Sequence, residues 1–87
     1  MLRIIYGNVF LKSARKLSNK LKPKLADCII TLKNNPFAPS LHTKYLSGKL
    51  IGLLSFRITR DWRVIFKFLE PDLIQLIEVA HRKDIYR

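Results

Sequence analysis

The chain of 87 residues is long enough for one domain with a modest hydrophobic core, and too short for a second domain or a deep cofactor cleft. Its hydrophobic fraction of 48% is that of an ordinary globular protein and argues against intrinsic disorder. The formal net charge of +11, from 17 Lys and Arg against 6 Asp and Glu, favours a polyanionic or acidic partner.

Cysteine usage and the lengths of the apolar runs indicate the cellular setting. The single cysteine, Cys28, excludes an internal disulfide and a cysteine-based zinc site, and we expect no metal and no other cofactor. No apolar run has the length of a secretion signal or the roughly 18 residues of a membrane span. The sequence therefore favours a reducing, cytoplasmic setting without a membrane partner.

The first half of the chain predicts a short strand followed by a helical hairpin. Residues 3–6 favour a strand that ends at Gly7, and Asn8 is positioned to cap the helix that follows. Helical spacing marks two apolar stripes, one formed by Phe10, Ala14, Leu17 and Leu21, the other by Leu25, Cys28, Ile29 and Leu32. Pro23 fits the first turn of the second helix, so we expect the hinge at residues 21–23.

After the second helix ends at Asn34-Asn35-Pro36, a long connection leads to a half that predicts strands. Apolar and polar residues alternate over residues 54–59 and again over residues 63–68. Residues 70–72 (Glu-Pro-Asp) favour a turn, and residues 73–80 are apolar enough on both faces for a central strand. We therefore expect a three-stranded antiparallel meander.

Opposed residues of two strands must share a face of the sheet, which constrains the pairing of the first two strands of the meander. Placing Phe56 opposite Phe66 satisfies this rule and leaves residues 60–62 as the loop. In that register Arg57 and Arg63 are diagonal neighbours on the exposed face, away from the helices. Two guanidinium groups on one face, with no acidic residue in the pattern, suit an anion.

The predicted architecture is α+β, with residues 1–87 in a single domain. An N-terminal strand and a helical hairpin precede the meander, and the helices pack on one face of a twisted antiparallel sheet. The other face of the sheet and the C-terminal segment remain for a ligand.

The C-terminal segment, residues 81–87, adds further chemistry. His81 can move a proton near neutral pH, Arg82 provides a fixed charge, and Tyr86 can stack on a base. Together with the two strand arginines, these groups match the needs of metal-free RNA cleavage. In that reaction the ribose 2′-hydroxyl loses a proton and attacks the adjacent phosphate, whose growing charge requires fixed positive donors.

Parts of the sequence resemble the RelE/ParE superfamily of toxins from type II toxin–antitoxin systems. The resembling stretches are residues 46–50 (Leu-Ser-Gly-Lys-Leu), 56–66 (Phe-Arg-Ile-Thr-Arg-Asp-Trp-Arg-Val-Ile-Phe) and 80–86 (Ala-His-Arg-Lys-Asp-Ile-Tyr). With the length, charge and order of elements, the resemblance extends over nearly the whole chain. It implies two helices packed on a twisted antiparallel sheet, as in the RelE-like fold.

The RelE branch is favoured, and it implies a ribosome-dependent mRNA endoribonuclease, or mRNA interferase, that inhibits translation. Toxins of this branch enter the ribosomal A site and cut mRNA without a metal, leaving a 2′,3′-cyclic phosphate and a 5′-hydroxyl. The implied partners are the ribosome, mRNA and a neutralising antitoxin encoded by a neighbouring gene, which forms a hetero-oligomer with the toxin.

The resemblance also implies roles for individual residues. Arg63 matches the phosphate-binding arginine, Arg82 a second transition-state cation, and Tyr86 the aromatic residue that stacks on the mRNA base. The full set of candidate catalytic residues is Arg57, Arg63, His81, Arg82 and Tyr86. The candidate contacts to RNA or the ribosome are Arg60, Trp62, Lys67, Lys83 and Arg87.

Several alternatives stay open at the level of sequence. The proton acceptor is either His81 or His42. The ParE branch shares the fold but inhibits DNA gyrase without nuclease activity, and a plain nucleic-acid-binding module is a third alternative. A solvated charged face is the alternative for Arg57 and Arg63, and a frayed basic terminus is the alternative for Arg82 and Lys83.

Overall fold

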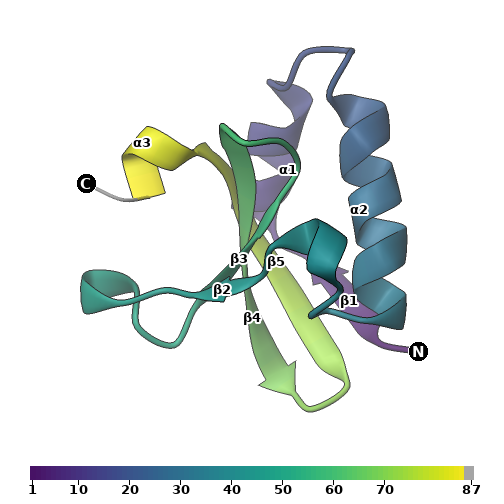
Figure 1. The fold of residues 1–87 in the computed structure, drawn as a ribbon, viewed down its shortest axis with the longest axis vertical. Helices are drawn as coiled ribbons and strands as arrows, with labels where there is room; N and C mark the ends of the chain where they lie inside the picture. Colours follow the sequence, from purple (N-terminus) through teal and green to yellow (C-terminus); the bar gives the residue numbers. More distant parts are fainter. Residues whose placement is uncertain (86–87) are drawn as a thin grey trace.

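The structure, a computed structural model, describes residues 1–85, so Tyr86 and Arg87 lie outside the described residues. The α+β class is confirmed, with the elements shown in Figure 1: β1 (Arg3–Tyr6), α1 (Asn8–Arg15), α2 (Lys22–Asn34), the short 3₁₀ helix η1 (Pro39–Leu41), β2 (Lys44–Tyr45), the 3₁₀ helix η2 (Gly48–Leu50), β3 (Leu54–Arg57), β4 (Trp62–Glu70), β5 (Leu73–His81) and α3 (Arg82–Ile85). No helix within residues 1–85 has the length and apolarity needed to cross a membrane.

The strands of the described chain form a five-stranded sheet in the order β1-β5-β4-β3-β2. Strands β3, β4 and β5 form the predicted antiparallel meander. The prediction of a wholly antiparallel sheet is wrong, because β1 runs parallel to β5. The short strand β2, which pairs with β3, lies where the sequence predicted only a connection. A sequence pattern shows that a segment is extended, but not its partner or direction, and two residues are too few to show alternation.

Gly7 allows β1 to lie close to β5 where the chain turns into α1. Its backbone N–H donates to the carbonyl oxygen of Leu76 over 3.0 Å. A Cβ at this position would lie 2.8 Å from the same oxygen, so only glycine permits this approach. Gly7 also takes the cap position of α1, and the predicted capping by Asn8 is wrong: Asn8 is the first helical residue, and no side chain caps the first turn.

Helix α1 ends at Arg15, so the hinge between the helices covers residues 16–21 instead of the predicted 21–23. The N–H of Leu17 donates to the carbonyl oxygen of Ala14, a tighter bond that closes the last turn. The hinge contains a Ser-Asn pair, whose side chains compete with helical hydrogen bonding. Leu17 and Leu21 therefore continue the helical spacing of apolar residues although α1 has already ended at Arg15.

Helix α2 follows the prediction, with Pro23 in its first turn and its end at Asn34. Helices α1 and α2 pack on one face of the sheet, as expected. The buried residues of this helix-side core are Phe10, Leu17, Leu25, Leu32, Leu41, Leu54, Phe56, Ile58, Val64, Phe66, Ile74, Leu76 and Val79. Their burial on one side of the sheet fixes which residues of β3 and β4 point to the other side.

The pairing of β3 with β4 is shifted by two residues from the prediction. Phe56 lies opposite Val64, where Phe66 was expected, and the loop covers residues 58–61. Both registers keep the apolar residues on the helix side, because a shift of two preserves the faces. The loop of the observed register is closed by hydrogen bonds from the backbone N–H groups of Ile58 and Thr59 to the carbonyl oxygen of Trp62, over 2.9 and 3.2 Å.

The opposite face of the sheet carries Ser55, Arg57, Arg63 and Ile65, and is called the arginine face here. The prediction that this face is exposed is wrong. A second, smaller core covers part of it, formed by Leu46, Ile65 and Ile85 with Leu50, Leu53, Ile77 and Ala80 packed around them. The chain between β2 and β3 and the short helix α3 supply these covering side chains, which sequence periodicity in the strands does not reveal.

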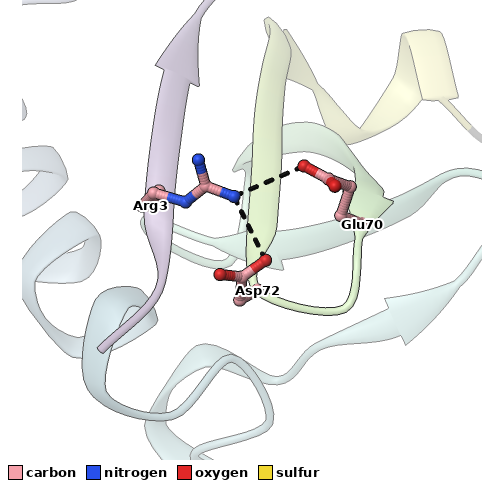
Figure 2. Close-up of polar contacts among 3 residues, drawn as sticks. All are labelled: Arg3, Glu70 and Asp72. Atoms are coloured by element: carbon pink, nitrogen blue, oxygen red, sulfur yellow. Dashed lines mark hydrogen bonds and ion pairs between the residues drawn. The ribbon is translucent and has the colours of Figure 1, made fainter.

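The β4–β5 hairpin turns at Pro71 and Asp72, as predicted, and an ion pair joins it to the N-terminal strand (Figure 2). The Nη2 atom of Arg3 lies 3.3 Å from Glu70 Oε2 and 3.3 Å from Asp72 Oδ1. The two carboxylates raise the pKa of Arg3, Asp72 having the larger effect. All three side chains are largely exposed, so the ion pair contributes little to the stability of the fold.

Candidate nucleic-acid site

Arg57 and Arg63 are directly opposed across the β3–β4 hairpin, instead of diagonal as predicted. Directly opposed residues have Cα atoms only about 4.5–5.5 Å apart, and two like charges so placed destabilise a sheet. The guanidinium of Arg57 makes no hydrogen bond or ion pair with any residue of the described chain, and its Nε atom is buried. Arg63 is only 4% exposed, and its Nη2 donates to the carbonyl oxygen of Arg60 over 3.2 Å. The sheet thus concentrates positive charge at one place.

Ser55 belongs to this site and was not among the residues predicted from sequence. It lies two residues before Arg57 on the same face, next to Lys44 across the β2–β3 pair. Its side chain is fully buried, and its Oγ has no hydrogen-bond partner in residues 1–85. A buried hydroxyl without a partner costs about 1–3 kcal/mol. Strand alternation alone would have placed this hydroxyl beside Arg57.

Arg82 lies at the same end of the sheet as Arg63. Its Nε is 3.7 Å from Asp61 Oδ1, and its backbone N–H donates to the carbonyl oxygen of Asp61. Arg63 donates to Arg60, the residue next to Asp61, so both guanidinium groups contact the same loop. Arg82, the first residue of α3, and Arg63 therefore contact neighbouring residues of the β3–β4 loop.

His81 is held by contacts to its neighbours at the end of β5. Its Nδ1 accepts a hydrogen bond from the backbone N–H of Lys83 over 3.2 Å, so the proton of the neutral imidazole resides on Nε2. Its ring meets that of Trp62 edge-on, with 5.2 Å between the ring centres. The two residues are direct partners in the β4–β5 register and point towards the helix side, whereas Arg63 points away from it.

Cys28 connects the helix layer to this site and does not supply a nucleophile. Its thiol donates to the carbonyl oxygen of Arg57, the last residue of β3, over 3.5 Å. Burial raises the pKa of the Cys28 thiol, the nearby Asp27 carboxylate raises it further, and Lys24 lowers it. The thiol is therefore protonated at neutral pH, and it acts as a small packed residue that helps to place β3.

The other residues predicted to contact RNA lie around this site at different distances. Lys67 shares the arginine face with Arg63 but stands four residues along β4, about 13 Å away. Arg60 and Lys83 are exposed, the first in the β3–β4 loop and the second in α3. The predictions for Tyr86 and Arg87 fall outside the described residues.

Two hollows open next to the covering side chains. The larger, of about 850 Å³, lies between the chain of residues 44–50 and the end of α3. The smaller, of about 370 Å³, lies over the arginine face of β4 and β5, and its lining includes Trp62, Ile65, Glu78, Ala80, His81 and Ile85. Within residues 1–85 no three His, Cys, Asp or Glu side chains gather in a way that could hold a metal ion.

Solved structures of similar shape are bacterial toxins, whereas no protein-family model and no curated protein matches the sequence. YafQ from E. coli strain BL21(DE3) superposes with a TM-score of 0.79 at 21% identity, over 100% of both chains. The YoeB/ParE toxin from Agrobacterium tumefaciens gives a TM-score of 0.76 at 19% identity, over 92% of this chain and 98% of that one.

The toxin–antitoxin complex RelBE2 from Mycobacterium tuberculosis contains a chain with a TM-score of 0.76 at 18% identity, covering 93% of this chain and 98% of that chain. At these identities the likeness concerns the fold, and it extends over nearly the whole length of each chain. The chain therefore has the fold of the RelE-like toxins.

Proposed function

We propose that the protein is the toxin of a type II toxin–antitoxin system and acts as a ribosome-dependent mRNA endoribonuclease. The observation that carries this proposal is the direct opposition of Arg57 and Arg63 on the face away from the helices. Two opposed guanidinium groups repel each other, and a phosphate bound between them makes an attractive contact with each. The RelE-like fold supports the same reading.

The proposed reaction is an internal transesterification of RNA. The ribose 2′-oxygen attacks the adjacent phosphorus, the bond from phosphorus to the 5′-oxygen breaks, and a 2′,3′-cyclic phosphate and a 5′-hydroxyl result. One proton leaves the 2′-hydroxyl and one reaches the leaving 5′-oxygen. Arg57 and Arg63 stabilise the extra negative charge on the phosphorus oxygens, and Arg82, which contacts the same loop as Arg63, is proposed for the same task.

His81 remains the candidate proton carrier among the described residues, although its side chain points to the helix side of the sheet and that of Arg63 points away from it. Its Nδ1 is occupied by the Lys83 N–H, so proton transfer uses Nε2. Because the tautomer is fixed by the Lys83 N–H, the neutral imidazole carries its proton on Nε2. Tyr86, by resemblance, stacks on the base next to the cut.

An antitoxin encoded by the neighbouring gene is the proposed protein partner. Chains of the same fold occur in the E. coli DinJ–YafQ toxin–antitoxin complex and in the heterotetrameric YoeB–YefM complex from Staphylococcus aureus. With a net charge of +11, this chain favours an antitoxin segment that carries acidic residues. The same charge supports approach to ribosomal RNA, and both partners place the proposed action in the cytoplasm.

The test expresses the wild type and an Arg63→Ala/Arg82→Ala variant and maps mRNA ends in translating cells. Lys16→Ala/Lys20→Ala, which removes the same charge from the exposed hinge, is the matched control. We expect cleavage within codons for the wild type and the control and none for the site variant. Because Arg63 is buried, the single variant Arg82→Ala is included as a change that leaves the sheet intact.

Equal toxicity without mRNA cleavage in any strain would contradict the nuclease. A gyrase inhibitor is then the alternative, and a plasmid supercoiling assay separates the two. Only a gyrase poison traps cleaved DNA, and the same purified toxin serves for both assays.

A further inference from the structure

A bulge in β5 turns one carboxylate onto the arginine face. Leu76 lies in the helix-side core, and strict alternation along β5 would place Glu78 in that core as well. Instead, Ile77 is an extra residue in the β4–β5 register, and Glu78 lies opposite Ile65, whose side chain belongs to the core on the arginine face. Bulges of this kind re-aim side chains and are frequent next to active sites.

Glu78 lines the smaller hollow, of about 370 Å³, together with Trp62 and His81. Ala80, which also lines it, is the direct β4–β5 partner of Arg63. The hollow therefore adjoins the candidate phosphate site through a single strand pair. Its volume is at the lower end of the range for ligand pockets, about 300–1,000 Å³, and suits one planar group better than a longer segment.

The carboxylate of Glu78 has no hydrogen bond or ion pair with any residue of the described chain. By contrast, Asp61, Glu70 and Asp72 each pair with an arginine. Glu78 stays unpaired although the chain has 17 Lys and Arg. Its negative charge repels phosphate, so the hollow does not suit a phosphate group. Its two oxygens accept hydrogen bonds from N–H groups, which nucleobases carry on their edges.

We propose that this pocket binds one nucleobase of the RNA and that Glu78 selects it by accepting hydrogen bonds from its Watson–Crick edge. This inference rests on the proposed function for the identity of RNA as the ligand. Guanine presents a ring N–H and an amino group side by side, which matches the two oxygens of a carboxylate. Adenine and cytosine present an amino group beside an acceptor, and uracil presents one N–H between two carbonyls, so guanine binds most tightly and uracil most weakly.

The experiment measures binding of 2′-O-methyl hexanucleotides, which cannot be cleaved, to purified toxin by fluorescence anisotropy. One probe is all uridine and the other carries a single internal guanosine. We expect the wild type to bind the guanosine probe at least about fivefold more tightly, and Glu78→Gln, which keeps the side-chain volume, to lose this preference. Asp27→Asn removes the same charge from the exposed surface of α2 and is expected to keep the preference.

Three results would overturn the inference. The first is an unchanged guanosine preference in Glu78→Gln. The second is an equal gain of affinity for both probes in Glu78→Gln and Asp27→Asn, which would assign the effect to net charge. The third is a retained preference combined with weaker capture of the purified antitoxin by Glu78→Gln, which would assign the pocket to a cationic side chain of that protein.

Mapping mRNA ends with the same variants separates this inference from the proposed function. Continued cleavage by Glu78→Gln with unchanged base composition at the cut sites would reject base selection and keep the nuclease. A guanosine preference that depends on Glu78, in a wild type that cuts no mRNA, would support the pocket and reject the nuclease.

Discussion

The thiol of Cys28 on α2 donates to the carbonyl oxygen of Arg57 at the end of β3, with 3.5 Å between sulfur and oxygen. The contact ties the helix layer to the strand that carries one member of the opposed arginine pair. It also places the cysteine where burial keeps its thiol protonated, and this has consequences that can be measured.

Alkylation of Cys28 should follow a raised pKa. Because burial favours the neutral thiol, the rate of reaction with iodoacetamide is expected to rise at a higher pH than that of a cysteine in a short unstructured peptide, whose pKa is about 8.5. The folded state thus holds the proton more tightly than the unfolded state. The contribution of the Cys28 thiol to the free energy of unfolding is fully present below the pKa of the thiol in the unfolded state, and it is lost as the pH rises through the pKa of the thiol in the folded state. Urea unfolding of the wild type should show this fall and Cys28→Ala should show less of it; identical pH profiles would contradict the assignment.

Replacing Arg57 by methionine should raise stability and remove activity. Methionine keeps an unbranched side chain without the charge and ends the repulsion of Arg63, so the free energy of unfolding is expected to rise by about 0.2–1 kcal/mol. The same change removes one of the proposed phosphate contacts and should abolish mRNA cleavage. Urea unfolding and mapping of mRNA ends provide the two readouts. Arg60→Met, in the exposed loop, is the control, and a loss of stability in Arg57→Met would show that the pair is not repulsive.

The small core on the arginine face should depend on Ile85. This side chain is 8% exposed and packs with Leu46 and Ile65, so Ile85→Ala is expected to reduce the free energy of unfolding by about 2–5 kcal/mol. Ile51 is 80% exposed in the same covering region, and Ile51→Ala should change it by no more than about 0.5 kcal/mol. Denaturant unfolding of both variants measures these changes in the free energy of unfolding. Equal effects would mean that α3 does not hold the covering side chains in place.

Salt dependence should reveal which cations meet phosphates. Removing one phosphate contact to single-stranded RNA lowers the slope of log K against log salt by about 0.7. We expect this reduction for Arg82→Gln, measured with the all-uridine 2′-O-methyl hexanucleotide. Lys20→Gln, exposed in the hinge between the helices, is expected to keep the wild-type slope. Equal slopes in all three proteins would place Arg82 outside the interface.

The sequence by itself determined most of the elements and the faces of β3 and β4. Phe56, Val64 and Phe66 are buried on the helix side of the sheet. Because side chains alternate along a strand, Arg57 and Arg63 must then lie on the side away from the helices. The position of Pro23 predicted the start of α2 from a constraint local to the chain. Such features follow from the spacing of apolar residues and from backbone chemistry, which act over a few residues.

Only the tertiary structure decided how these elements meet. Arg57 lies opposite Arg63 instead of the predicted Ile65, and the sequence could not distinguish these registers because a shift of two residues leaves every face unchanged. Closure of the arginine face depended on Leu46 and Ile85, which come from segments distant in sequence. The bulge that turned Glu78 onto the arginine face could not be predicted from the sequence of β5 alone. A bulge is an extra residue relative to the paired strand, so it is defined only by the pairing of β5 with β4.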